Sequence, residues 1–229
     1  MSTKTYFKPK NNWLLILSVV FLGILSGCSK KDEVIAVEGT AKVRLANAVP
    51  GSGPQDFYLN TTKITSNIAF GQSTPYQTIT SGTVNMFFTT MGTQDVNASL
   101  GAYVQPSSNY TVFYARSSAG QNGILGIADD VIAPAAGRAS VRFINLNASS
   151  SANITISAPT GNPIVTSLTE NTTSPVYSID PSLLLTATIS GTTIVQPIAV
   201  GTFVAGKSYI VWFTGTTTAD FAAHIMTTT

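Results

Sequence analysis

The stretches KVRLANA (residues 42–48) and SVRFINL (residues 140–146) decide the fold. In the first stretch, Val43 and Leu45 fall on one face while Arg44 falls on the other. Successive side chains of a β-strand point to opposite faces, so this period of two predicts a strand. The second stretch has the same pattern 98 residues further along the chain.

Two more blocks repeat in the same order. PSSNYTVFY (106–114) corresponds to AGKSYIVWF (205–213) at a shift of 99 residues. STPY (73–76) is similar to TSPVY (173–177). Three similar blocks at nearly one spacing predict a duplicated domain of about 100 residues and not a short solenoid repeat. The small residues of 133–137 are typical of a linker between the two copies.

The composition favours an all-β chain. Hydrophobic residues make up 44% of the 229 residues and charged residues only 10%, which indicates a chain that can bury a core. Period-two segments alternate with Pro/Gly/Ser-rich turns, and no sustained helical period is present. We therefore predict two tandem immunoglobulin-like antiparallel β-sandwich domains, at 41–132 and 138–229.

The N-terminal segment has the features of an export signal. Residues 1–12 are polar and basic, and an apolar stretch of 15 residues follows from Trp13 to Gly27. The alternative is a transmembrane anchor. As a helix the apolar stretch would be about 22 Å long at about 1.5 Å per residue, whereas the hydrocarbon core needs about 30 Å. We predict a signal peptide at 1–27.

Leu25-Ser26-Gly27-Cys28 resembles a lipobox, the maturation site of bacterial lipoproteins. The resemblance implies cleavage between Gly27 and Cys28, a diacylglyceryl group on the Cys28 thiol and an acyl group on the new amine. Two or more acyl chains hold a protein stably on a membrane. Residues 28–40 are then the acylated cysteine and a flexible tether. Cys28 is the single cysteine, so the chain has no intramolecular disulfide.

Lys31, Asp32 and Glu33 follow the lipobox closely. They resemble the acidic surface-export signal of Bacteroidota lipoproteins, which implies an outer-membrane protein exposed on the cell surface. The alternative interpretation is a solvated tether.

The repeated strands also carry a family resemblance. Residues 43–59, with Tyr76, Gly82 and Tyr110, resemble the domain of unknown function 4397, which is common in exported bacterial proteins. The first copy fits over roughly 41–130, and the second copy fits loosely. The family has no established activity, so the resemblance implies fold and export and no chemistry.

Several function classes are disfavoured by the residues present. Lys4, Lys8 and Lys10 lie in the predicted signal, and without them 9 basic residues face 10 acidic ones. The mature chain thus lacks the cationic surplus that nucleic-acid binding needs. His224 is the only histidine, no Gly-x-Ser-x-Gly elbow is present, and we expect His224 to be a satisfied strand-edge residue. We predict no catalytic residue, no metal site and no cofactor, with Asp129-Asp130 as a weak calcium alternative.

Residues repeated in both copies are predicted to be structural. We expect Arg44 and Arg142 to pack their stems along the sheet with wet guanidinium groups. We expect Asn47 and its equivalent Asn145 to cap the turns that follow them. Two further residues at a shift of 99, Tyr110 and Tyr209, are predicted to bond nearby backbone through their hydroxyl groups.

The sequence favours a non-catalytic envelope or cell-surface module, anchored in the membrane by lipid, that binds an envelope protein or a glycan. The end loops 49–55 and 147–152 are where we expect binding. Trp212 with Phe57 or Tyr103 is an alternative sugar contact, although core packing is favoured for Trp212. The alternatives are a glycan-active hydrolase working through paired carboxylates, and a small-ligand or lipid carrier. The second domain has only Glu170, Asp180 and Asp220 as acidic residues, and their spacing follows no recognisable catalytic pattern.

Overall fold

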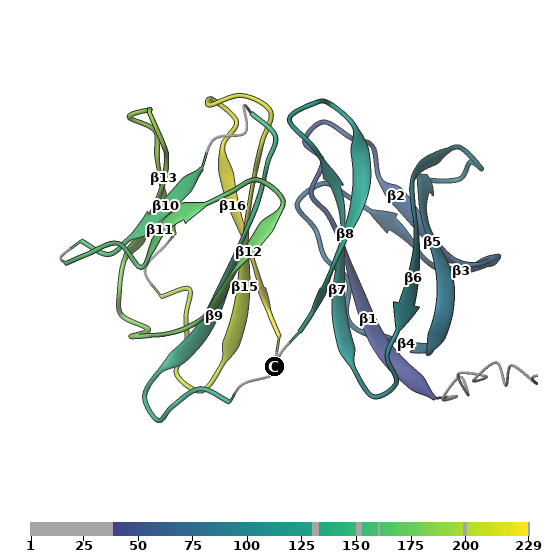
Figure 1. The fold of residues 1–229 in the computed structure, drawn as a ribbon, viewed down its shortest axis with the longest axis horizontal. Helices are drawn as coiled ribbons and strands as arrows, with labels where there is room; N and C mark the ends of the chain where they lie inside the picture. The colour runs from purple at the N-terminus through teal and green to yellow at the C-terminus, as the bar shows by residue number, and fades with distance from the viewer. Residues whose placement is uncertain (1–38, 130–132, 150–152, 160, 199–200, 229) are drawn as a thin grey trace, which may run out of the picture. The chain divides into compact units, whose positions relative to one another are not determined.

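The computed structural model describes residues 39–129, 133–149, 153–159, 161–198 and 201–228, and in them the fold is entirely β (Figure 1). Sixteen strands form four sheets of four strands each. The described part of the chain includes no helix long and apolar enough to cross a membrane. The predicted fold class, two tandem β-sandwiches, is confirmed.

The first sandwich consists of two facing sheets, ordered β4-β1-β7-β8 and β3-β2-β5-β6. Its strands are β1 (Thr40–Asn47), β2 (Gln55–Leu59), β3 (Thr62–Ile68), β4 (Gln77–Thr80), β5 (Gly82–Thr90), β6 (Val96–Val104), β7 (Asn109–Arg116) and β8 (Asn122–Ala128).

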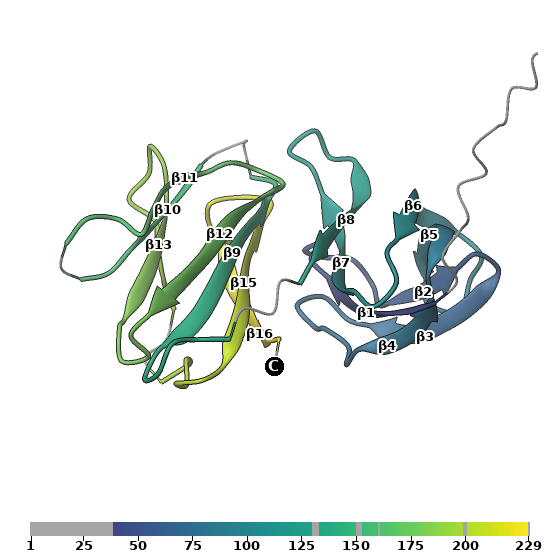
Figure 2. The ribbon, with the colours of Figure 1, turned by 60° about the horizontal axis from the view of Figure 1, so that its bottom comes forward.

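The second sandwich repeats this topology strand for strand. Its sheets are ordered β12-β9-β15-β16 and β11-β10-β13-β14, so each strand has an equivalent eight positions earlier (Figure 2). The strands are β9 (Ala139–Asn147), β10 (Ile154–Ser157), β11 (Val165–Leu168), β12 (Thr172–Ile179), β13 (Leu185–Ile189), β14 (Val195–Ile198), β15 (Ser208–Gly215) and β16 (Ala222–Thr227). The predicted linker 133–137 lies between β8 and β9.

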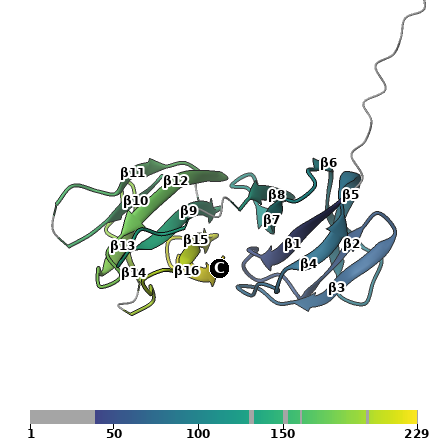
Figure 3. The same cartoon turned by 90° about the horizontal axis from the view of Figure 1, so that it is seen from below.

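Each sandwich also contains a pairing that the alternation pattern did not predict. The first strand of each copy pairs in parallel with the seventh, β1 with β7 and β9 with β15, while all other pairs of named strands are antiparallel. Figure 3 shows β1 beside β7 and β9 beside β15. A parallel pair needs a long crossover connection, and here the intervening strands of the sandwich provide it. The two pairings have equivalent registers, with Val43 opposite Tyr110 and Val141 opposite Tyr209.

Alternation along β1 and β7 explains where the apolar side chains go. Val43, Leu45 and Val112 are buried in the core of the first sandwich. Their neighbours Ala46 and Phe113 point to the other face and belong to a separate buried cluster with residues of β9 and β15. Both faces of the central part of this sheet are therefore buried, at residues 43–47 of β1 and 111–115 of β7.

Candidate functional site

The outer face of the β3-β2-β5-β6 sheet carries two neighbouring aromatic side chains. Phe57 of β2 and Phe88 of β5 are fully buried in the core, so the adjacent residues Tyr58 and Phe87 point outward. Tyr58 lies directly opposite Phe87 in the antiparallel register, which places their Cβ atoms about 5 Å apart. The two half-buried rings line an open groove of about 350 Å³, called the aromatic groove below. Its lining residues are Tyr58, Asn60, Thr61, Phe87, Thr89, Gln94 and Val96.

A neutralised ion pair lies beside the aromatic groove. Lys63 Nζ is 5.3 Å from the centroid of the Tyr58 ring and 2.6 Å from Asp56 Oδ2. The Asp56 carboxylate is buried and also accepts the backbone N–H groups of Asn67 and Gly92. Burial pushes the pKa of Asp56 upward, but these hydrogen bonds outweigh it and hold the pKa below its ordinary value. Asp56 therefore stays ionised and cancels the charge of Lys63 at neutral pH.

Polar groups surround the two rings. Asn60 holds its turn by accepting the Asn85 N–H at 2.9 Å on Oδ1, which leaves its amide nitrogen for other partners. Thr61 and Gln94 are exposed. Thr89 Oγ1 is buried and has no hydrogen-bond partner among the described residues. Aromatic surface with a few amide and hydroxyl groups is the usual lining of sites for small polar ligands.

Exposed apolar side chains gather on the same sheet. Within the described residues, four of the six large apolar side chains that are exposed belong to the β5–β6 hairpin. They are Met91, Val96, Leu100 and Tyr103. Leu100 lies opposite the core residue Met86, whereas Tyr103 lies opposite the exposed Thr83, so these side chains are divided between the two faces of the hairpin.

A buried charged cluster lies on the opposite sheet of the first sandwich. Arg44 Nε donates to Thr111 Oγ1 at 2.8 Å and lies 3.8 Å from Asp129 Oδ2. The hydroxyl groups of Tyr76 and Thr111 donate to the Asp129 carboxylate. Burial, and then the hydrogen bond to Asp129, raises the pKa of Tyr76 well above its ordinary value. The donors of this cluster bond Asp129, Thr111 and a backbone carbonyl, except for Arg44 Nη2, which is buried without a hydrogen-bond partner among the described residues. The cluster is therefore structural in character.

The expectation of wet arginine heads is wrong for Arg44, whose residue is only 3% exposed. Its Nη1 donates to the backbone carbonyl of Thr227 in the second sandwich at 2.6 Å, so packing between the sandwiches buries the guanidinium. Arg142 is partly exposed, and its Nη1 donates to the carbonyl of Ala128 at 2.7 Å.

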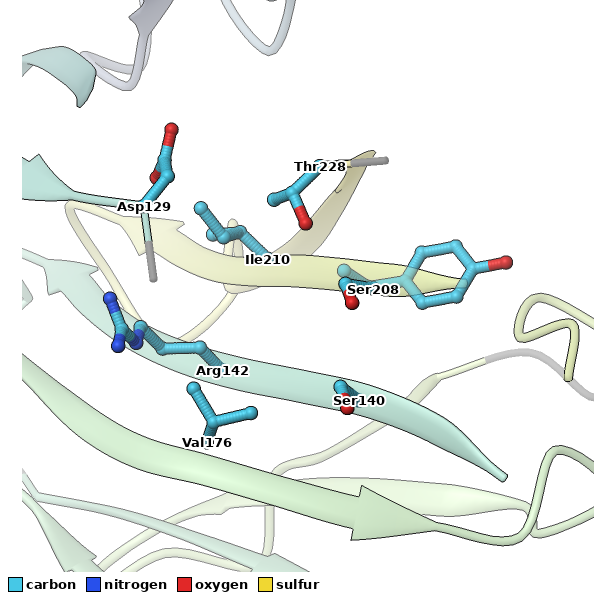
Figure 4. Close-up of a pocket in the computed structure, with 8 residues that line it drawn as sticks. Asp129, Ser140, Arg142, Val176, Ser208, Ile210 and Thr228 are labelled. Atoms are coloured by element: carbon cyan, nitrogen blue, oxygen red, sulfur yellow. The ribbon is translucent and has the colours of Figure 1, made fainter. Parts of the chain in front are cut away.

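A cavity of about 20 Å³ lies beside Arg142 and Asp129 (Figure 4). Thr228 and Ile210 of the second sandwich also line it. That volume suits about one water molecule. It is too small to hold a substrate.

The predicted turn and corner residues are confirmed. Asn47 Oδ1 accepts the Val49 N–H, and Asn145 Oδ1 accepts the Asn147 N–H at 3.0 Å. The hydroxyl oxygen of Tyr110 accepts the N–H of Gln105 at 3.2 Å. In the second copy, the Tyr209 hydroxyl accepts the N–H of Val204 at 3.0 Å, so both hydroxyls bond backbone five residues upstream.

His224 is a satisfied residue on the edge strand β16, as predicted. Its Nε2 lies 2.8 Å from Thr214 Oγ1, and its ring stacks on Trp212 at 5.2 Å. Burial lowers the pKa of His224. Trp212 itself is 1% exposed and packs on Phe113, so core packing is confirmed for it.

The alternative sugar contact that combined Trp212 with Phe57 or Tyr103 is wrong. Trp212 and Phe57 are buried in different clusters, and only Tyr103 is exposed. The three rings therefore share no surface.

The acidic residues considered for metal binding or catalysis accept hydrogen bonds from the protein, Glu170 from the first sandwich and Asp180 and Asp220 from their own turns. Glu170 accepts the N–H and the hydroxyl of Ser118, and Asp180 accepts those of Ser182. Asp220 binds a turn of the second sandwich in the same way. No group of three or more His, Cys, Asp or Glu side chains suited to a metal ion occurs within the described ranges. Asp130 lies outside them.

Other predicted positions fall wholly or partly outside the described residues. Gly27, Cys28, Lys31, Asp32 and Glu33 all lie there. So does part of the end loop 147–152.

The other end loop, 49–55, is held from within. Its two ends, Val49 and Gln55, are buried, and Ser52 Oγ bonds Asn47. The loop is therefore held by the core at both ends and by a side-chain hydrogen bond in its middle.

Sequence reasoning missed the aromatic groove. The signal was present in two strands, QDFYL at 55–59 and GTVNMFFTT at 82–90, where adjacent aromatic residues must point to opposite faces. One ring of each pair had to lie outside the core. Pairing of β2 with β5 then brings the two outward rings together.

The chain matches the family described as Domain of unknown function (DUF4397) over residues 41–157. The match covers all of the first sandwich and continues through β9 and β10 of the second. No curated protein matches the chain. Because the family match covers more than half of the 229 residues, the chain belongs to the DUF4397 family.

Proposed function

We propose that this protein is a lipid-anchored envelope module without catalytic activity, and that its first sandwich binds a glycan in the aromatic groove. The predicted acylation of Cys28 would hold it on a membrane, with residues 28–40 as the tether. The proposal for the groove rests on one observation. Tyr58 and Phe87 lie in register on an open sheet face, beside amide and hydroxyl groups.

The chemistry of the groove favours an uncharged or weakly charged sugar chain. The apolar face of a pyranose ring packs on an aromatic ring, while its hydroxyls bond amides and hydroxyls at the edge. Lys63 lies beside the Tyr58 ring of the groove, and its salt bridge with Asp56 neutralises its charge. A phosphate-rich or nucleic-acid ligand would require unpaired basic side chains.

The test is a binding titration of the mature protein against a panel of purified bacterial and host polysaccharides. Affinity gel electrophoresis identifies a binding polysaccharide, and isothermal titration calorimetry on its oligosaccharides gives the dissociation constant. Tyr58→Ala and Phe87→Ala should each weaken binding at least tenfold, because each removes a stacking surface worth about 1.4 kcal/mol or more. Tyr103→Ala is the matched control, since Tyr103 is an exposed aromatic residue of the same sheet that does not line the groove.

Two outcomes would contradict the glycan proposal. One is a complete absence of binding across the panel by a protein whose fold is intact by circular dichroism. The other is equal weakening by Tyr103→Ala and the groove variants, which would indicate a diffuse surface effect. Binding of an envelope protein that Tyr58→Ala abolishes would assign the groove to a protein partner instead.

Exposure on the cell surface is a separate part of the proposal. Lys31, Asp32 and Glu33 support it through their resemblance to a surface-export signal. Protease added to intact cells should degrade the protein, and replacement of Asp32 and Glu33 by Asn and Gln should protect it. Complete protection of the unaltered protein in intact cells, with degradation after lysis, would place it on an inner face.

A hydrolase or a carrier has less support. The carboxylates of Asp56, Asp129 and Asp220 are each engaged by two or more donors of the protein, whereas glycoside hydrolysis needs two carboxylates facing one substrate. The interior of each sandwich is filled by packed apolar side chains, whereas a lipid carrier needs an apolar lumen. The binding interpretation therefore leads.

A further inference from the structure

The two arginine contacts between the sandwiches are reciprocal. Arg44 of the first copy donates to the carbonyl of Thr227 at 2.6 Å, and Arg142 of the second donates to the carbonyl of Ala128 at 2.7 Å. Arg142 is the equivalent of Arg44 at the 98-residue shift, and Thr227 is the equivalent of Ala128 at the 99-residue shift. Each copy therefore gives to the other the contact that it receives. Reciprocity of this kind is the mark of an interface with two-fold symmetry.

The backbone confirms that these positions are equivalent. The N–H of Asp129 donates to the carbonyl of Asn109, and the N–H of Thr228 donates to the carbonyl of Ser208. Asp129 and Thr228 are 99 residues apart, and so are Asn109 and Ser208. β8 and β16 thus leave their sheets in the same way.

The apolar part of the interface follows the same rule. Phe113 of β7 and its equivalent Trp212 of β15 pack on each other with ring centroids 5.7 Å apart. The buried cluster between the sandwiches contains three more equivalent pairs. Two come from β1 and β9 with the residues that follow β1, and the third comes from β8 and β16. The pairs are Ala46 with Ile144, Ala48 with Leu146, and Ile127 with Met226.

We infer that the chain is an internal dimer, in which one self-complementary sheet face, present in both copies, closes on itself across a pseudo-two-fold axis. In the first copy this face is the outer surface of β1, β7 and β8, and in the second copy that of β9, β15 and β16. The partner that fits the face of the first sandwich is the duplicated domain itself. The second sandwich thereby buries Arg44 and leaves the opposite sheet, with the aromatic groove, open. The inference does not depend on the proposed function.

The two copies contribute side chains of different size and polarity to the interface. Ala46 and Ala48 of the first copy are smaller than their equivalents in the second, Ile144 and Leu146, and all four lie in the same buried cluster. Similarly, Trp212 of the second copy is larger than its equivalent Phe113. Glu170 contacts Ser118 without a reciprocal contact, because Thr217, the equivalent of Ser118, bonds Asp220 instead. The two faces have therefore diverged in sequence while keeping equivalent residues in contact.

Cutting the linker of the folded protein tests the inference. A protease site is placed in 133–137, whose residues 135–137 are exposed, and the mature chain is cut after folding. The halves should remain one particle at micromolar concentration by size-exclusion chromatography and native mass spectrometry. Trp212 is the single tryptophan outside the predicted signal peptide, so its emission reports on the interface directly. The emission should stay blue-shifted after cutting and move to the red when dilution separates the halves.

Phe113→Ser should weaken the association of the cut halves at least tenfold, and Tyr103→Ser, on the other sheet, should change it less than twofold. Circular dichroism of each cut variant guards against unfolding, and the cut wild-type protein remains decisive if Phe113→Ser does not fold. Separation of the wild-type halves at tens of micromolar, with their β-structure retained, would overturn the inference. So would a solvent-exposed Trp212 in the uncut protein.

Discussion

Removal of the Asp129 carboxylate should be among the most damaging single changes in this protein. The side chains of Arg44 and Asp129 are 4% and 1% exposed, and the carboxylate accepts hydrogen bonds from Tyr76 and Thr111. Burial lowers the pKa of Arg44, and the nearby carboxylate opposes that shift. In Asp129→Ala the guanidinium remains buried without its counter-charge. Losing one partner of a buried pair costs about 3–5 kcal/mol.

That cost is a large fraction of the total stability. A domain of this kind has a free energy of unfolding of about 5–15 kcal/mol. For a chain of this size, each kcal/mol shifts Tm by roughly 2–4 °C, so Tm should fall by roughly 10 °C. Urea unfolding of the mature protein at pH 7, followed by Trp212 fluorescence and circular dichroism, measures the change directly.

Two matched variants show that the effect comes from the unpaired charge. Asp180→Ala removes an exposed carboxylate that accepts from Ser182, and it should lower the urea midpoint much less than Asp129→Ala does. Arg44→Met combined with Asp129→Leu replaces the pair by apolar side chains and should be more stable than Asp129→Ala alone. If Asp129→Ala unfolds within 1 kcal/mol of the wild type, the account of a buried charged cluster is wrong.

Three further predictions concern the second copy and the corner hydroxyls. Burial lowers the pKa of His224, so as the pH falls the unfolded chain takes up a proton before the folded one does. The contribution of His224 to stability is therefore present above pH about 6.5 and declines as the pH falls towards the folded-state pKa. His224→Gln should make the free energy of unfolding in urea less dependent on pH between pH 7 and 5, and an unchanged pH dependence would refute this. Tyr110→Phe and Tyr209→Phe should each cost about 1 kcal/mol in chemical denaturation, and a neutral result for both would remove the corner role. Thr228→Asp places a carboxylate where the first copy has one, near Arg142, and should raise Tm at low salt more than at high salt; lower stability at every salt concentration would contradict the equivalence.

The parts of the fold set by local pattern could be predicted from sequence. Alternation along 42–48 and its repeat at 140–146 predicted strands, and the ordered blocks predicted two copies. Asn47 and Tyr110 were assigned correctly because their partners lie two and five residues away. Short-range hydrogen bonds follow from the residue type and its place beside a turn.

The parts set by strand pairing and by packing between copies could not be predicted. A period of two shows that β1 is a strand but not that it pairs in parallel with β7. The expectation of a solvent-exposed Arg44 guanidinium was wrong because the alternation of apolar residues does not show that the second sandwich covers that face. The aromatic groove needs the register that sets Tyr58 opposite Phe87, and that register joins residues far apart in the chain.

The central claim is that this chain leaves the cytoplasm and is held on a membrane through the sulfur of Cys28. Cells expressing the full chain are grown with an alkyne-bearing fatty acid, and the protein is captured and examined by click labelling and intact-mass spectrometry. The wild type should carry the label, begin at Cys28 and sediment with membranes, whereas Cys28→Ala should be unlabelled and retain residues 1–27. An unlabelled wild-type protein, or a Cys28→Ala variant with the same mass loss and the same membrane fractionation, would contradict the claim.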